Sequence, residues 1–306
     1  MSQFWTLGHI LRRCHQANIA TWATTVGPVP TAPQYAVLTV VAGTNRPDMQ
    51  YVGSAASLDK TTLTGVARRL ERDGWIQRYQ DTEDHRRFLL RLTASGAIAL
   101  RQTAPLAAQA QAAFLVPVAP EDHERLIWLL QELSRLPASP PSGGDISMTA
   151  WRQMTTSPGH LIRRAQQAHT AHWQAEFGQE LTGPQHAVIR MVGLQGKTTH
   201  SRLTDLAALD KATLSSVVNR LVHVGFLSTQ TDEHDRRVRW ITLTDAGREM
   251  FVTAQPRVQR VQAELAAPLA EEDRPWLQDV LEKLVFRSGA PDVDIVNSGA
   301  AVSPAE

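Results

Sequence analysis

Apolar residues recur every three to four positions over several long stretches, and this spacing predicts amphipathic helices. The longest predicted helices span 4–25 and 155–177. Thr31 and Thr182 are suitable N-caps for a following helix, since a proline stands in the first turn after each. Shorter apolar runs at 75–79 and 88–92, and again at 226–229 and 238–243, predict strands of two hairpins. The chain is therefore expected to be mainly α, with two small hairpins.

The same order of elements occurs twice along the 306 residues. HILRRCHQANIATW at 9–22 matches HLIRRAQQAHTAHW at 160–173, and LDKTTLTGVARRL at 58–70 matches LDKATLSSVVNRL at 209–221. Both matches are 151 residues apart, and about 30 of 90 aligned positions are identical. The repeat and its composition predict a domain at 1–136, a Pro/Gly/Ser-rich linker at 137–150, a second domain at 151–287 and a flexible tail at 288–306.

Each copy contains a predicted helix-turn-helix. A short helix near 51–57 or 201–207 leads into a longer one at 60–73 or 211–224. Gly74 and Gly225 stand where a helix ends with a C′ glycine. Further helices are predicted to begin after Thr93 and Thr244, and the copies end with helices near 121–135 and 271–286.

Composition narrows the class of protein. Hydrophobic residues make up 42% and charged residues 20%, which is typical of a globular chain. Cys14 is the only cysteine, so an intrachain disulfide and a Cys-rich zinc site are excluded and a reducing, cytoplasmic compartment is expected. The start lacks the pattern of a signal peptide, and no apolar run reaches 18 residues, so no membrane partner is expected.

Charge is unevenly distributed. The net charge is only +1, yet residues 60–91 carry a balance of +3 and residues 211–242 a balance of +2. These segments contain the longer helix of each helix-turn-helix and the hairpin after it. Positive charge is therefore concentrated where contacts to phosphate would be needed.

The motifs LDKTTLTGVARRLERDGWIQR and DTEDHRRFLLRLTASG in copy one, with LTDLAALDKATLSSVVNRLVHVGFL and DEHDRRVRWITLTDAG in copy two, are specific. Each copy resembles a MarR-type winged helix-turn-helix regulator. The resemblance implies an α+β winged-helix fold and pairing of two domains through their terminal helices. One chain carries both domains, so an intramolecular pseudo-dimer is expected, in which a self-contained monomer reads a pseudo-palindromic or asymmetric operator. The alternative is pairing with a second chain to give four lobes.

The resemblance also implies which residues contact double-stranded DNA. The second helix of each helix-turn-helix enters the major groove, and the hairpin, called the wing, reaches the minor groove. In the wing of copy one, His85 stands where copy two has Arg236, which puts in doubt whether that wing binds DNA as tightly as the wing of copy two. The predicted DNA-binding residues are Lys60, Thr61, Thr62, Thr64, Arg68, Arg86 and Arg87 in copy one, and Lys211, Thr213, Ser215, Ser216, Asn219, Arg236 and Arg237 in copy two.

Members of this family commonly release DNA when a small aromatic or carboxylate effector binds between the paired helices and the winged domain. Residues that recur on the first helix of both copies suit such a ligand, because Arg holds a carboxylate and Trp stacks on a ring. Redox sensing through Cys14 and a zinc site at His169 and His172 are weaker alternatives. The predicted effector residues are His9, Arg13, Gln16 and Trp22, with His160, Arg164, Gln167 and Trp173.

The sequence thus predicts a sequence-specific DNA-binding transcription regulator, specifically a repressor released by a small effector. It is not expected to be an enzyme, because it contains neither a phosphate-binding glycine loop nor a G-x-S-x-G motif. No cofactor and no metal are expected. The alternative is a small-molecule-binding or protein-interaction module that kept the winged fold with weak or lost DNA binding. Gly53 within the first helix of the copy-one helix-turn-helix motivates that alternative.

Overall fold

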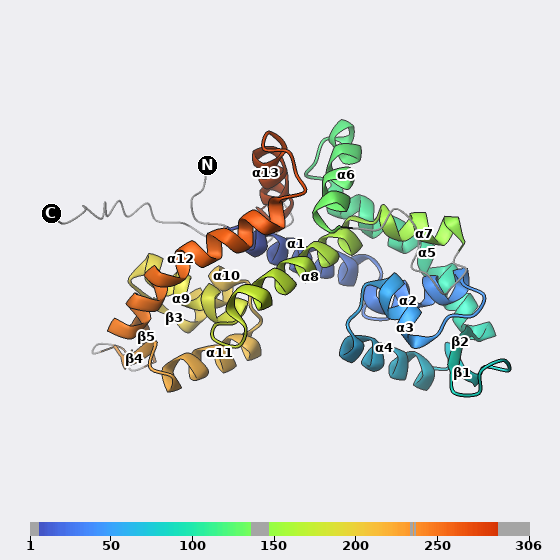
Figure 1. The fold of residues 1–306 in the computed structure, drawn as a ribbon, viewed down its shortest axis with the longest axis horizontal. Helices are drawn as coiled ribbons and strands as arrows, with labels where there is room; N and C mark the ends of the chain where they lie inside the picture. The colour runs from blue at the N-terminus through green and yellow to red at the C-terminus, as the bar shows by residue number, and fades with distance from the viewer. Residues whose placement is uncertain (1–5, 136–146, 233–234, 236, 287–306) are drawn as a thin grey trace.

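The computed structural model describes residues 6–135, 147–232, 235 and 237–286. Two lobes of helices, each with a small sheet, flank a central group of helices (Figure 1). The predicted tail, most of the predicted linker and Arg236 lie outside the described residues. Among the helices described, none is long and apolar enough to cross a membrane.

Lobe 1 follows the predicted order of elements. Its first half consists of α1 (Leu7–Thr25), α2 (Ala32–Gly43), α3 (Met49–Ala56) and α4 (Lys60–Arg72). The wing is formed by β1 (Ile76–Gln80) and β2 (Phe88–Leu92), which pair antiparallel. The lobe ends with α5 (Ala94–Leu115), a 3₁₀ turn at Pro120–Asp122 and α6 (His123–Leu133).

After α7 (Met148–Thr155), lobe 2 repeats this order with one addition, β3. It consists of α8 (Pro158–Phe177), α9 (Gly183–Gln195), β3 (Lys197–Thr199), α10 (His200–Ala207), α11 (Lys211–His223), β4 (Leu227–Thr231), β5 (Arg239–Leu243), α12 (Asp245–Ala266) and α13 (Asp273–Phe286).

Local signals in the sequence fix several helix ends. Thr31 and Thr182 each form a capping box with the glutamine three residues later, which satisfies amide groups at both helix starts. Gly74 and Gly225 follow their helices with φ of +71° and +82°. This left-handed conformation is available to glycine without strain, so the predicted C′ glycines are confirmed.

A motif L-T-x-x-G, at 92–96 and again at 243–247, connects each wing to the helix after it. Thr93 caps α5, and its amide donates to the carbonyl of Trp75 at 3.1 Å. A Cβ added to Gly96 would lie 1.9 Å from that same carbonyl oxygen, and one added to Gly247 would lie 2.0 Å from the carbonyl oxygen of Phe226. The glycine of the motif is therefore required by the close approach of two backbones.

The two copies share one hydrophobic core. Helix α1 packs against α8 and α13, and α6 packs against α8 and α13. Leu11 and Phe114 of the first copy and Leu161 and Leu281 of the second are fully buried in the same cluster. At the junction, Arg125 forms an ion pair with Asp273 at 2.6 Å and lies over the ring of Trp276. Terminal helices of the two copies therefore pack against each other in this chain.

Helix α7 is a departure from the prediction, which placed a linker up to residue 150 and a single helix from 155. Trp151 and Met154 are buried in the core of lobe 1, and α7 packs against α2. Ser147 donates its amide to the carbonyl of Gly43. The segment after the linker therefore completes the first winged domain in space, although it precedes the second in sequence.

Strand β3 is the second departure. Thr198 pairs with Ile241 in a three-stranded sheet of order β3-β5-β4. The equivalent position in lobe 1 is Pro47, which has no amide proton to donate to a ladder. Only an isolated bridge between Asp48 and Leu89 forms there.

Candidate DNA-binding face and effector pocket

Helices α4 and α11 lie along the same side of the molecule, with the wings β1–β2 and β4–β5 at the two outer ends (Figure 1). Helices α6 and α13 project from the opposite side. Helices α4 and α11 are each the second helix of a helix-turn-helix. Binding to successive major grooves requires that both lie on the same side of the molecule. This surface is called the reading face below.

On α4 the predicted contact residues are exposed. Lys60, Thr64 and Arg68 face solvent, whereas Leu63 is buried in the lobe core. Thr62 is exposed too, but its hydroxyl donates to the Asp59 carboxylate at 2.5 Å and so reinforces the helix cap. The backbone amide of Thr61 also donates to Asp59, at 3.0 Å.

On α11 the predicted residues divide into two groups. Lys211, Ser216 and Asn219 are exposed. Thr213 and Ser215 are half-buried: the first hydroxyl donates to the Asp210 carboxylate at 2.6 Å, and the second lies 3.2 Å from His200 Nε2. Their hydroxyls are therefore already engaged within the lobe.

The apolar spacing of α11 puts Leu214, Val217 and Leu221 on one side of the helix. Leu214, Leu221 and also Val218 are buried, whereas Val217 is partly buried and packs against the same core. The two valines are adjacent, and the period of 3.6 residues does not separate neighbours at the edge of an apolar stripe.

The two wings differ in how their arginines are held. Arg86 and Arg237 occupy equivalent tip positions, and the Arg237 side chain is 93% exposed with a contact to Asp235. Arg87 forms an ion pair of 2.5 Å with Asp48, the N-cap of α3. A basic residue that the sequence reasoning missed, Arg46, forms ion pairs with Asp81 and Glu83 and ties wing 1 to its lobe.

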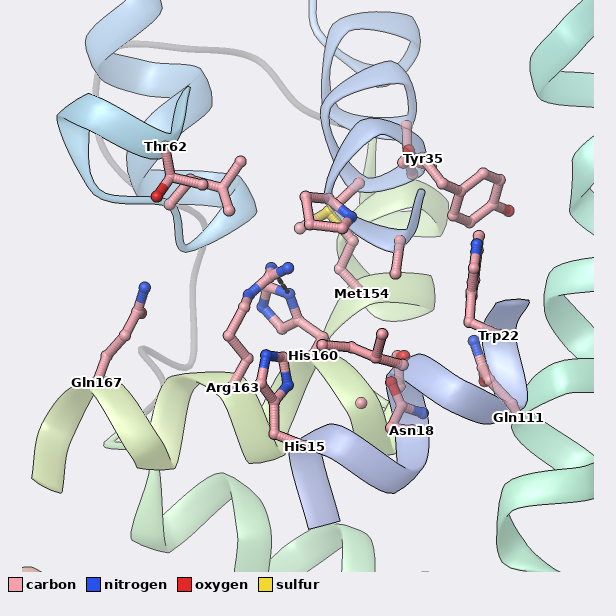
Figure 2. Close-up of a pocket in the computed structure, with 18 of the residues that line it drawn as sticks. His15, Asn18, Trp22, Tyr35, Thr62, Gln111, Met154, His160, Arg163 and Gln167 are labelled. Carbon is pink, nitrogen blue, oxygen red and sulfur yellow. Dashed lines mark hydrogen bonds between the residues drawn. The ribbon is translucent and has the colours of Figure 1, made fainter. Parts of the chain in front are cut away.

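A pocket of about 290 Å³ lies between the paired helices and the reading face of lobe 1. Residues from α1, α2, α4, α7 and α8 line it (Figure 2). Trp22 and Tyr35 supply aromatic surface, with ring centroids 5.5 Å apart. The Trp22 indole donates to the Pro30 carbonyl at 2.8 Å, and Gln153 of α7 donates to the Tyr35 hydroxyl at 2.7 Å. These bonds hold both rings in place.

Arg163 supplies the positive charge of the pocket. It donates to the Ala56 carbonyl at 2.5 Å and to His160 Nδ1 at 3.1 Å, and its Nε has no acceptor among the described residues. None of the ion pairs found in the described part of the chain includes Arg163. Burial, with the neighbouring charge of Arg164, lowers the pKa of Arg163 to about 10, so the guanidinium stays charged at neutral pH.

The histidines beside Arg163 are neutral. Burial, with the charge of Arg163, lowers the pKa of His15 to about 4 and lowers that of His160 well below its usual value. Because Arg163 must donate to His160 Nδ1, the proton of the neutral ring is on Nε2, which then donates to Ser57 Oγ at 3.2 Å. His15 Nδ1 has no partner among the described residues and lies within the pocket lining.

The structure brings together only part of the predicted effector set. Trp22, His160 and Gln167 line the lobe 1 pocket, whereas Arg164 lies outside its lining and donates to Ser57 Oγ at 2.8 Å. Reasoning from sequence chose Arg164 and missed Arg163, although Arg12-Arg13 and Arg163-Arg164 are kept in both copies. Adjacent helical residues diverge by about 100°, and only one of each pair can face the pocket.

The equivalent place in lobe 2 holds a cavity of about 20 Å³, lined by His9, Trp173 and Arg12 among others. The two remaining predicted effector residues do not line it. Arg13 is buried, and Gln16 donates to the Ala208 carbonyl at 3.0 Å.

The other sensing chemistries find little support. Cys14 is fully buried, its thiol donates to the Leu281 carbonyl at 3.3 Å, and burial raises its pKa. Such a thiol is protected from oxidants. No group of three His, Cys, Asp or Glu residues in the described part of the chain is placed to hold a metal ion.

Comparison with known proteins agrees with this geometry. A model described as the MarR family matches residues 31–88, and one described as a winged helix DNA-binding domain matches residues 181–247. The transcriptional regulator HosA of Escherichia coli is 30% identical over 126 residues, which are 41% of this chain and 93% of HosA. The chain belongs to the MarR family. It is a DNA-binding transcription regulator with two winged domains in tandem.

Two further proteins are similar to this chain. The transcriptional repressor NicR of Pseudomonas putida is 27% identical over 150 residues, which are 47% of this chain and 92% of NicR. A solved structure of Bordetella bronchiseptica BpsR, whose DNA binding is regulated by 6-hydroxynicotinic acid, is 30% identical. It covers 41% of this chain and 96% of its own, with a TM-score of 0.40.

Proposed function

We propose that this MarR-family chain is a repressor that one small aromatic carboxylate releases from DNA. The lobe 1 pocket supports the effector class, the reading face supports the DNA partner, and a named repressor, NicR, is among the relatives. The two unequal lobes favour an operator with two half-sites, either pseudo-palindromic or asymmetric.

Arg163 is the observation that carries the effector class. A guanidinium taken out of water without a carboxylate partner is costly, and an anion bound beside it recovers that cost. The Arg163 Nε is unpaired among the described residues, and the neutral His15 offers a further polar atom next to it. The rings of Trp22 and Tyr35 then provide the apolar surface on which a planar ligand stacks.

The same contacts couple the pocket to DNA reading. From α8, Arg163 holds the Ala56 carbonyl, and Gln167 donates to the Ser57 carbonyl at 2.9 Å. Ser57 adopts φ of +53° at the turn of the helix-turn-helix, and Asp59, the N-cap of α4, lines the pocket. An anion that draws Arg163 away from Ala56 therefore acts on the turn that positions α4. Such a ligand favours lobe positions that do not fit DNA.

The test uses a labelled duplex from the region upstream of the protein's own gene and 6-hydroxynicotinate as the probe. Fluorescence anisotropy should give salt-dependent binding of the duplex, because phosphate contacts release counterions. Adding the probe should lower the DNA affinity, whereas nicotinamide, which lacks the carboxylate, should not. Binding of the duplex that neither compound alters would contradict the effector class. Absence of salt-dependent binding would contradict the DNA-binding role.

A further inference from the structure

The repeat places a second effector site in lobe 2, related to the lobe 1 pocket by the shift of 151 residues. Helix α1 provides His9 and Arg12 there, where α8 provides His160 and Arg163 to lobe 1. Trp173 is the equivalent of Trp22, and its indole makes the equivalent bond, to the Leu181 carbonyl at 2.6 Å. The two sites thus share these parts of their frame, whereas α7 contributes to the lobe 1 pocket alone.

The volumes of the two sites differ by more than tenfold. The lobe 1 pocket has about 290 Å³, close to the lower end of ligand sites, which is roughly 300 Å³. The lobe 2 site has about 20 Å³, enough for one water molecule and no organic ligand. Part of this difference comes from the side chains that stand at equivalent positions of the two sites.

Three side chains differ between the two sites: two are larger in lobe 2, and in the third a histidine stands where lobe 1 has the larger tyrosine. Asn18, Tyr35 and Thr39 line the lobe 1 pocket. Their equivalents in lobe 2 are His169, His186 and Arg190, which all line the small cavity. The largest change is from Thr39 to Arg190, which places a long side chain where lobe 1 has a short one.

The filling side chains are fixed by their neighbours. The rings of His169 and His186 lie 5.8 Å and 5.1 Å from the ring of Trp173, on which both pack. Gln262 lies 3.3 Å from His169 Nε2, and its side-chain oxygen accepts the Gly8 amide at 3.1 Å. A Cβ on Gly8 would lie 2.2 Å from His169 Nε2, so the ring is seated directly on the backbone of α1. The closed state is a packed arrangement across the lobe boundary.

We infer that the chain binds one effector molecule, in lobe 1, and that lobe 2 carries the same site permanently closed by His169, His186 and Arg190. This inference rests on the proposed function for the ligand's class. The closed site fixes lobe 2 against α1 as a constant DNA reader, and only the lobe 1 helix α4 responds to the effector.

The first test does not depend on the ligand. Ala36 and Ala187 are equivalent positions that line the open and the closed site. Ala36→Cys and Ala187→Cys are labelled with iodoacetamide, and the wild-type chain with its buried Cys14 serves as the blank. The labelling rate of the Ala36→Cys variant should be at least tenfold higher than that of the Ala187→Cys variant, while both variants react fully in denaturant. Equal rates in folded protein would overturn the inference.

The second test counts bound 6-hydroxynicotinate by isothermal titration calorimetry. The wild-type chain should bind one equivalent. His169→Asn/His186→Tyr/Arg190→Thr should bind two, and the reciprocal Asn18→His/Tyr35→His/Thr39→Arg should bind none. Duplex binding and the melting temperature identify variants that fail to fold. Two equivalents in the wild type would overturn the single-site inference and leave the proposed function intact. If no probe binds at all, the proposed effector class fails, and the labelling rates alone decide whether lobe 2 is closed.

Discussion

At the scale of single residues, the pockets depend on which member of an adjacent pair faces inward. Arg163 points into the lobe 1 pocket (Figure 2), and Arg164 holds the Ser57 hydroxyl instead. The repeat in the sequence showed that both arginines are kept, but the phase of α8 against lobe 1 depends on packing with α1 and α6. That packing is a property of the assembled chain, so the sequence alone did not show which arginine of the pair lines the pocket.

Arg163→Gln should weaken binding of 6-hydroxynicotinate by roughly 10- to 100-fold, since a hydrogen bond to a charged group contributes about 1.5–3 kcal/mol. Arg12→Gln changes the equivalent residue in the closed lobe 2 site and is the matched control. Calorimetry on both variants checks this. Equal loss in the two variants would show that Arg163 acts through stability and not through ligand contact.

Buried histidines make stability depend on pH. Burial, with the nearby charge of Arg12, lowers the pKa of His169 to about 4, and burial with Arg190 and Arg12 lowers that of His186 to about 3. The unfolded chain binds these protons near pH 6.5. Stability is therefore complete above pH 6.5 and is lost as the pH falls toward 4, by about 1.4 kcal/mol per pH unit for each such group.

Thermal melts from pH 7.5 to pH 5.0 should accordingly show a falling melting temperature. His169→Asn/His186→Tyr, which installs the lobe 1 residues, should make that dependence smaller, and the buried His15 and His160 keep the remainder. His172→Asn, which changes a histidine outside the site lining, is the control. A double variant with the same pH dependence as the wild type would assign the effect to other groups.

At the scale of elements, helix ends were the most predictable feature, because capping and C′ residues act locally. The Thr31 and Thr182 caps and the Gly74 and Gly225 ends could all be predicted. Helix α7 and strand β3 could not, because α7 is stabilised by burial in the other lobe and β3 by a partner about 40 residues away. Lobe 1 has only a single bridge at the place of β3, because Pro47 cannot donate a hydrogen bond to a ladder. The sequence contains this signal, although the strand itself was not predicted.

The glycine of L-T-x-x-G can be tested by adding one methyl group. Gly96→Ala should destabilise the chain by about 1–3 kcal/mol, because its Cβ would overlap the Trp75 carbonyl and force the backbone to shift. Gly65→Ala lies in the same lobe on α4, where the added Cβ would make only an ordinary contact with the Arg69 side chain at 3.8 Å, and should be neutral or stabilising by up to about 1 kcal/mol. Denaturant unfolding compares the two. Equal stability would contradict the close approach.

The wings contribute to DNA affinity through their exposed arginines. Arg86→Ala/Arg237→Ala should weaken binding of the upstream duplex and lower the slope of log affinity against log salt, by about 1 for each phosphate that the variant no longer neutralises. Lys283→Ala on α13, on the side of the molecule opposite the reading face, should leave both quantities unchanged. Affinity and slope that survive the double substitution would show that the wings do not bind DNA.

At the scale of the whole molecule, the proposed function requires one chain to contain both helices that read DNA, α4 and α11. The shared core of α1, α6, α8 and α13 joins the copies as two protomers would be joined. The duplication was evident from the sequence, whereas the pairing was expected only from the resemblance to the MarR family. The difference between the lobes was only partly evident from the sequence. Its main form is one open and one closed pocket, and the closed pocket depends on the packing of His169 on Gly8 and Trp173.

The most direct test of this account is the solution mass by light scattering, alone and with the upstream duplex. A self-contained pseudo-dimer predicts the mass of one chain, 33.8 kDa, and a complex of one chain with one duplex. Twice that mass, with two chains on each duplex, would contradict it. Chains would then pair through a further surface, and the operator would be a longer site with four readers.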